Sequence, residues 1–135
     1  MTQEDKELLL KDLCARLPYG VKVLVDNKHW CDFNGRTPSE ITFDNSYRLL
    51  FLGTELGYVK PYLFPLSSMS EEQKQEYTYI MNYISPDDTD NWKEGEFIYV
   101  EQFTQLMHFY HINHLDYRGL IPKDLAIDAT GLGIY

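Results

Sequence analysis

The chain has 135 residues, and its 44% hydrophobic and 24% charged residues are typical of a single globular domain with a buried core. The 21 acidic and 12 basic residues give a net charge of −9, which disfavours direct binding to nucleic acid or to an anionic membrane. There is no signal-peptide pattern and no apolar run of the ~18 residues that span a bilayer, and Cys14 and Cys31 match no disulfide or zinc motif, so a cytoplasmic location is expected.

The first predicted element is an amphipathic helix over residues 3–17. Apolar side chains recur at the spacing i, i+3, i+4 and i+7, which places them on one stripe of a helix. The predicted buried stripe consists of Leu10, Leu13, Cys14 and Leu17. Pro18 and Gly20 follow directly and end this helix.

Residues 20–66 are predicted to form an antiparallel sheet of about three to five strands, with a partial barrel as the alternative. VKVLV (residues 21–25) and KHWCDF (residues 28–33) are predicted to form a hairpin, and YRLLFLG (residues 47–53) is apolar enough for a buried strand. YVKPYLFPL carries two prolines, which lack the N–H of a sheet ladder and favour an edge position or non-strand structure. A partner protein could cover this edge between Lys60 and Pro65.

Residues 70–115, in the C-terminal half of the chain, are predicted to be helical. Ser70 opens its first helix, because Gln73 three residues later completes a capping box. A second helix follows from about residue 97. The predicted buried stripes are Tyr77, Ile80, Met81 and Ile84 on the first and Tyr99, Phe103, Leu106, Met107 and Tyr110 on the second.

Residues 116–135 are predicted to be an irregular tail that ends in a flexible GLGIY. In this tail Arg118 is expected to form a salt bridge with Asp116 or Asp128. The expected fold class is therefore α+β, a single domain over residues 1–135 in which about three amphipathic helices pack a small sheet.

Three of the four histidines lie three residues apart in the segment HFYHINHLDYRG. On a helix such residues fan out by about 60° per step, so His108, His111 and His114 cannot all bind one metal ion. The alternative is a metal site of His111, His114 and Asp116, which would support a metal-dependent hydrolase. Helical zinc pairs are usually four residues apart, as in HExxH, so structural roles are favoured and no cofactor is expected.

Acidic residues concentrate in the second half of the chain, where residues 67–135 carry twelve acids and four bases. Acids and tyrosines on the unburied side of a helix favour contact with another protein. The predicted interaction surface consists of Glu71, Glu72, Glu76, Tyr79, Tyr83, Asp87, Asp88 and Asp90. The alternative is that these acids imitate the phosphates of a duplex and occupy a host DNA-binding protein.

Three segments carry a resemblance: LLLKDLCARLPYGVKV, VKPYLFPLSSMSEEQKQEY and HLDYRGLIPKDLAIDATGLGIY. They resemble a family of short acidic proteins of uncharacterised activity from gut anaerobic bacteria and their phages or mobile elements. The resemblance implies a genomic setting, inside a bacterial host cell, and transfers no functional residue. Because the sequence shows no nucleophile motif, phosphate loop or basic patch, a non-enzymatic accessory protein that binds another protein is expected, with self-association left open.

Overall fold

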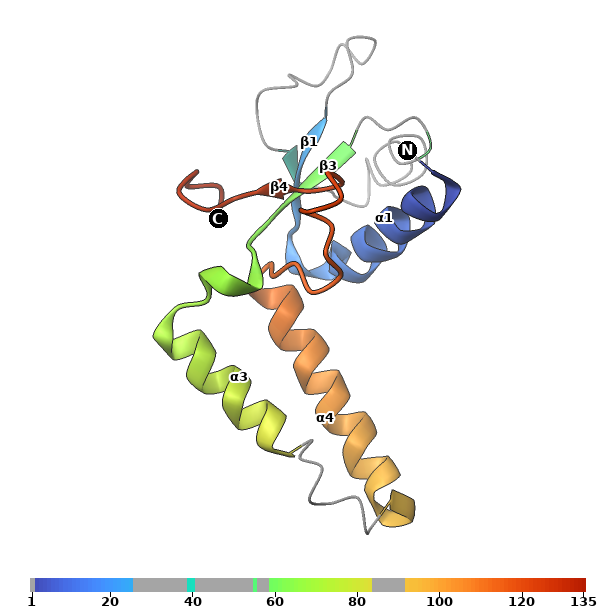
Figure 1. Ribbon diagram of the computed structural model, residues 1–135, viewed down its shortest axis with the longest axis vertical. Helices are drawn as coiled ribbons and strands as arrows, with labels where there is room; N and C mark the ends of the chain where they lie inside the picture. Colours follow the sequence, from blue (N-terminus) through green and yellow to red (C-terminus); the bar gives the residue numbers. More distant parts are fainter. Residues whose placement is uncertain (1, 26–38, 41–54, 56–58, 84–91) are drawn as a thin grey trace.

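The computed structural model describes residues 2–25, 39–40, 55, 59–83 and 92–135 and, within them, all side chains except those of residues 39–40, 82–83 and 92–101. The helices of this part are α1 (Gln3–Arg16), α3 (Glu71–Tyr83) and α4 (Trp92–Ile112), and the strands are β1 (Lys22–Val25), β2 (Ser39–Glu40), β3 (Val59–Leu63) and β4 (Ile127–Asp128). The predicted α+β class, a small sheet with three helices, is confirmed (Figure 1). The strands predicted at residues 28–33 and 47–53 lie outside the described residues.

The described strands form one open sheet in the order β2-β1-β3-β4. β1 pairs antiparallel with β2 and with β3, whereas β3 pairs parallel with β4. The parallel pair arises because α3 and α4 separate β3 from β4 along the sequence, and such a long crossover allows β4 to return in the same direction. The sheet is thus mixed rather than purely antiparallel, and its described strands do not close into a barrel.

β3 is a central strand between β1 and β4, so the edge position predicted from its prolines is wrong. Pro61 lies opposite Val23 of β1. Its nitrogen faces the β4 side, because Leu63, two residues further on, accepts a hydrogen bond there from the amide of Ala129 at 2.8 Å. β4 begins opposite Tyr62, beyond this proline, so the missing N–H costs no ladder hydrogen bond.

α1 covers the sheet with a face rotated from the predicted one. Its buried residues are Leu9, Asp12, Leu13 and Arg16, whereas Cys14 is exposed. The predicted stripe counted apolar residues only, and two charged side chains occupy the true buried face. The core between α1 and the sheet consists of Leu9, Leu13, Val21, Val23, Val25, Val59, Leu63, Leu120, Leu125 and Ala126, so the predicted irregular tail contributes to it.

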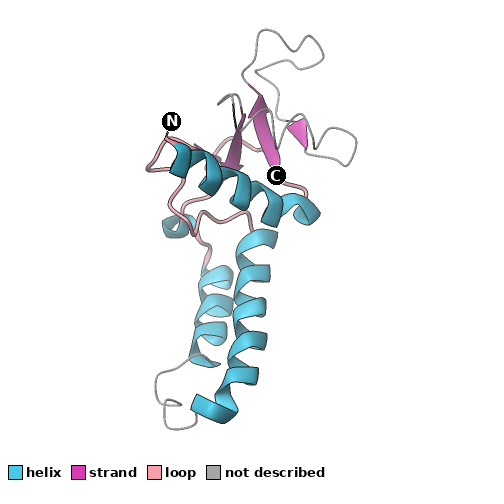
Figure 2. Cartoon of the chain, turned by 90° about the vertical axis from the view of Figure 1, so that its right-hand side faces the viewer, coloured by secondary structure: helices cyan, strands magenta, loops and turns pink. Residues whose placement is uncertain are grey.

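α3 and α4 run side by side as a hairpin that projects from the body formed by α1 and the sheet (Figures 1 and 2). The capping box predicted at Ser70 is present, since Ser70 Oγ accepts from the amide of Gln73 and the side chain of Gln73 accepts from the amide of Ser70. A second core of Ile80, Phe109, Tyr110 and Leu115 joins the hairpin to the body. No helix in the described part is both long enough and apolar enough to traverse a bilayer.

The buried face of α4 also differs from the predicted one. Phe103 belongs to the predicted buried stripe, but 54% of its surface is exposed, and Phe109 is buried instead. α4 begins at Trp92, earlier than predicted, and Gln102 is a polar member of its buried face. Apolar periodicity misplaced the stripe because α4 is apolar on more than one side and only one of these sides meets α3.

Candidate functional site

The three histidines of the segment 108–114 have three different aromatic partners. Nδ1 of His108 lies 3.1 Å from the hydroxyl of Tyr19, and Nε2 of His111 lies 2.8 Å from the hydroxyl of Tyr117. α4 ends at Ile112, and His114 follows in a turn with a left-handed φ of 54°. This turn directs the ring of His114 onto Tyr135, with 3.6 Å between the ring centroids.

The alternative metal site of His111, His114 and Asp116 is not assembled. Both carboxylate oxygens of Asp116 are occupied, since they accept hydrogen bonds from the amides of Leu120 and Ile121 at 2.8 and 2.9 Å. Asp116 therefore stabilises the turn that follows it. Across the described ranges no group of three or more His, Cys, Asp or Glu side chains is placed to hold a metal ion.

A buried ionic network lies next to these histidines. Asp12 and Arg16 of α1 have completely buried side chains, and Arg16 Nε donates to Asp12 Oδ2 at 2.7 Å. Arg118 Nε donates to Asp12 Oδ1 at 3.1 Å, so the expected pairing of Arg118 with Asp116 or Asp128 is wrong. Arg16 Nη2 donates to the carbonyl of Leu115 at 2.6 Å. The carboxylate of Asp12 thus joins α1 to the segment that follows α4.

Tyr117 is the aromatic centre of this network. The guanidinium carbons of Arg16 and Arg118 lie 5.2 and 4.9 Å from its ring centroid, within the range of cation–π attraction. Its ring also stacks on Tyr110 at 4.7 Å. Asp12, Arg16, Tyr117 and Arg118 therefore contact one another, and these contacts indicate a structural role for the network.

Burial sets the protonation of the groups around this network. Burial lowers the pKa of His114 to about 4, and the positive charges of Arg16 and Lys22 act in the same direction. Burial and the nearby Arg16 also lower the pKa of His111. Burial raises the pKa of Tyr110 to about 12, and a hydrogen bond with Tyr77 adds to this effect. Both histidines are therefore neutral at pH 7.

The predicted acidic interaction surface lies in part on α3. Glu71, Glu72 and Glu76 are exposed there, and Lys74 Nζ lies 3.5 Å from a carboxylate oxygen of Glu71. Tyr79 is also exposed, by 61%. Of the remaining predicted residues, Tyr83 ends α3 with its side chain outside the described part, and Asp87, Asp88 and Asp90 lie outside the described residues.

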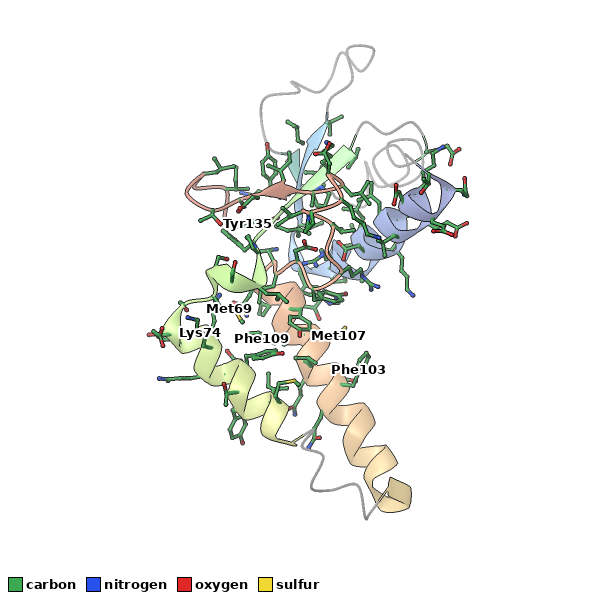
Figure 3. All side chains as sticks on the ribbon, viewed as in Figure 1. Met69, Lys74, Phe103, Met107, Phe109 and Tyr135 are labelled. Atoms are coloured by element: carbon green, nitrogen blue, oxygen red, sulfur yellow. The ribbon has the colours of Figure 1, made fainter. Side chains whose placement is uncertain are left out.

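Helix geometry divides these residues between two sides of α3. Glu72, Glu76 and Tyr79 follow one another at i, i+4 and i+7 and fall within about 60° around the axis. Glu71 lies about 100° around the axis from Glu72, on the flank that carries Lys74. The outer surface of α3 forms a shallow depression on this flank, and the depression reaches Tyr79. Lys74 points away from α4 (Figure 3). We call Glu72, Glu76 and Tyr79 the acidic stripe.

Sequence reasoning missed three residues that organise the molecule: Asp12, Arg16 and Tyr135. The i, i+4 spacing of Asp12 and Arg16 is a signal for an ion pair on a helix, but only the fold shows that it is buried. Comparisons with protein-family models, curated proteins and solved structures find no match for this protein.

Proposed function

We propose that this protein acts by binding another protein through the acidic stripe of α3, and that the partner presents a basic surface. The observation that carries the proposal is the one-sided packing of α3. Only Gln73, Tyr77 and Ile80 are covered to a substantial degree among its described side chains, which leaves the stripe exposed along the projecting hairpin.

The chemistry of the stripe favours a protein ligand. Tyr79 supplies a rigid aromatic surface with a polar tip, and rings of this kind are enriched at the energetic centres of interfaces. Glu72 and Glu76 flank it with negative charge, which speeds encounter with a basic partner and rejects acidic ones. The role is that of a non-enzymatic accessory protein, and it requires no cofactor.

The proposed setting follows from the family resemblance of the sequence. It is the cytoplasm of a bacterial host in which the protein is encoded by a phage or a mobile element. A host protein with a basic surface is the partner expected there. Occupation of a host DNA-binding protein by acidic mimicry is the second form that this binding could take.

Affinity capture from the native host tests the proposal. The wild-type protein is compared with the variant E72Q/E76Q/Y79A and with the control E4Q/E7Q, which neutralises two exposed acids in the first turns of α1. We expect one partner to be retained by the wild type and the control and lost by the stripe variant. Equal capture by all three proteins contradicts the proposal.

Salt and DNA separate the two forms of binding. A mimic of DNA is displaced by added duplex and loses affinity steeply as the salt concentration rises. A partner that recognises Tyr79 and its flanking acids loses affinity less steeply and is indifferent to duplex. A binding isotherm at several salt concentrations, with and without competing duplex, distinguishes these outcomes.

A further inference from the structure

Tyr135 is 42% exposed, and both its hydroxyl and its ring contact other parts of the molecule. Its hydroxyl donates to the carbonyl of Tyr62 at 2.8 Å and accepts from the amide of Lys22 at 2.9 Å. Its ring lies on the imidazole of His114, with an interplanar angle of 11°, and Lys22 Nζ lies 5.9 Å from the ring centroid. The ring centroid of Phe64 lies 5.9 Å from that of Tyr135. Figure 3 shows Tyr135 beside the sheet.

The polar contacts of this site discriminate between side chains. A backbone N–H and a backbone carbonyl from neighbouring strands converge on one oxygen, which must therefore both accept and donate a proton. A phenol hydroxyl meets this requirement, whereas a phenylalanine ring leaves the amide of Lys22 and the carbonyl of Tyr62 without this partner. A site built to hydrogen-bond a hydroxyl strongly rejects the analogue that lacks it.

Residues 130–135 are held mainly by contacts of their last two residues. Residues 130–133 are exposed, and the backbone contacts of this stretch are local, from Thr130 to Asp128 and from Leu132 to Ala129. Gly131 and Gly133 have left-handed φ values of 76° and 66°, which glycine adopts without strain. Lys22 Nζ then donates to the carbonyl of Ile134 at 2.9 Å. The anchoring contacts are therefore concentrated at Ile134 and Tyr135.

We propose that Lys22, Tyr62, Phe64 and His114 form a binding site for a tyrosine side chain, which the protein fills with its own Tyr135 and which also accepts residues 130–135 of a second copy. Ile134 and Tyr135 of an exchanged segment find the same partners in the second copy, so exchange restores the anchoring contacts that it breaks. Residues 130–133 are exposed and contain two glycines, so the backbone can change direction there as exchange requires. This site is independent of the acidic stripe on α3.

β4 and Ala129 cover the side of β3 that would otherwise be an open edge, the segment in which the sequence predicts a partner-binding edge. Addition of an extended segment to this edge is a known form of peptide recognition. β4 performs that role within its own molecule. The hydroxyl of Tyr135 lies elsewhere, between Lys22 of β1 and Tyr62 of β3. Local concentration likewise favours the binding of Tyr135 in its own molecule when the protein is dilute.

Peptide binding to the full-length variant Y135A tests the site. The probes are the hexapeptides TGLGIY and TGLGIF, which differ only in the hydroxyl. We expect TGLGIY to bind to Y135A, to show no binding to the wild type, and to bind at least about tenfold more tightly than TGLGIF. A folded Y135A that binds neither peptide, or both equally, overturns the proposal.

A second measurement keeps the test decisive if Y135A does not fold. Y135F retains the ring and loses the hydroxyl. Hydrogen exchange of the Lys22 amide is expected to be at least about tenfold faster in Y135F than in the wild type, relative to the Val23 amide in each protein. Unchanged protection of Lys22 would show that the hydroxyl is not bound there.

Exchange between copies is tested by mixing two full-length variants. Y135A has a complete site and lacks the tyrosine, whereas H114N retains the tyrosine and loses the stacking surface, with an asparagine that tolerates the left-handed backbone of position 114. Native mass spectrometry is expected to show a heterodimer in the mixture and less dimer in either variant alone. A mixture that stays monomeric at concentrations where TGLGIY binds rules out exchange.

Discussion

Nε of Arg16 donates a hydrogen bond to Asp12 at 2.7 Å, and both side chains are completely buried. Two charges in the interior are tolerated only when each has partners, and the guanidinium of Arg118 and the carbonyl of Leu115 supply further ones. Among the described residues, Nη1 of Arg16 has no hydrogen-bond partner. This arrangement fastens α1 to the segment after α4, across a large separation in sequence. Its stability therefore depends on the network as a whole.

Removal of one partner should be far more costly than removal of an exposed charge. Asp12→Ala leaves Arg16 buried without its counter-charge, and we expect it to lower the free energy of unfolding by about 3 to 5 kcal/mol. The control Glu7→Ala, an exposed acid on the same helix, should change it by less than about 0.5 kcal/mol. Urea denaturation measures both, and similar values for the two variants would contradict the structural role of Asp12.

The ring and the hydroxyl of Tyr117 should make separate contributions to the free energy of unfolding. Tyr117→Phe keeps the ring between the two guanidinium groups and loses the hydrogen bond to His111, so we expect a loss of about 1 kcal/mol. Tyr117→Leu also loses the cation–π contacts and the stack on Tyr110, and a further loss of about 1 to 2 kcal/mol is expected. Denaturation of both variants checks the order, and equal losses would assign no role to the ring.

Stability should fall when the solution is acidified between pH 6.5 and about 4. The folded pKa of His114 is about 4, below the 6.5 of an ordinary histidine, so the unfolded state binds a proton in this window and the folded state does not. Stability from this residue is present above pH 6.5 and is lost by about pH 4, and it amounts to at most about 3 kcal/mol. His111, with its lowered pKa, acts in the same direction.

Denaturation of the wild type and H114N at a series of pH values checks this effect. H114N lacks the titrating ring, so its stability should decline less between pH 6.5 and 4. Parallel curves for the two proteins would show that His114 is not held neutral. The depressed pKa of Asp128 affects the curve only below its ordinary value of 3.8, outside this window.

Tyr110 should make the stability of the protein depend on pH in the alkaline range as well. Its folded pKa of about 12 exceeds the ordinary value of 10, so its contribution is present below pH 10 and is lost as the pH rises towards 12. Tyr110→Phe removes this titration, and its stability should depend less on pH above 10. Ultraviolet absorbance of the phenolate follows the ionisation directly, and a normal tyrosine titration for position 110 would refute the shift.

The sequence by itself determined the features that depend on neighbours along the chain. The first helix was predicted at residues 3–17 and observed at Gln3–Arg16, and the capping box of Ser70 formed as its spacing requires. The exposure of Glu72 and Tyr79 on α3 also followed from helical periodicity. These features are local, because the groups that stabilise them lie within one or two turns of each other.

The tertiary structure alone decided which side of each element is buried. Apolar periodicity assigned Cys14 to the core of α1 and Phe103 to that of α4, whereas Arg16 and Phe109 are buried there. The counter-charge of Arg16 is Asp12 on the same helix. The groups that complete this buried network, the carbonyl of Leu115 and the guanidinium of Arg118, lie about a hundred positions further on.

The same reason explains the tail. GLGIY has no periodicity and contains two glycines, which is typical of a flexible end. Tyr135 is nevertheless fixed, because its hydroxyl finds backbone groups of Lys22 and Tyr62 on two different strands and its ring finds His114. Partners at such separations are brought together only when the protein folds, so no pattern in the neighbouring sequence encodes them.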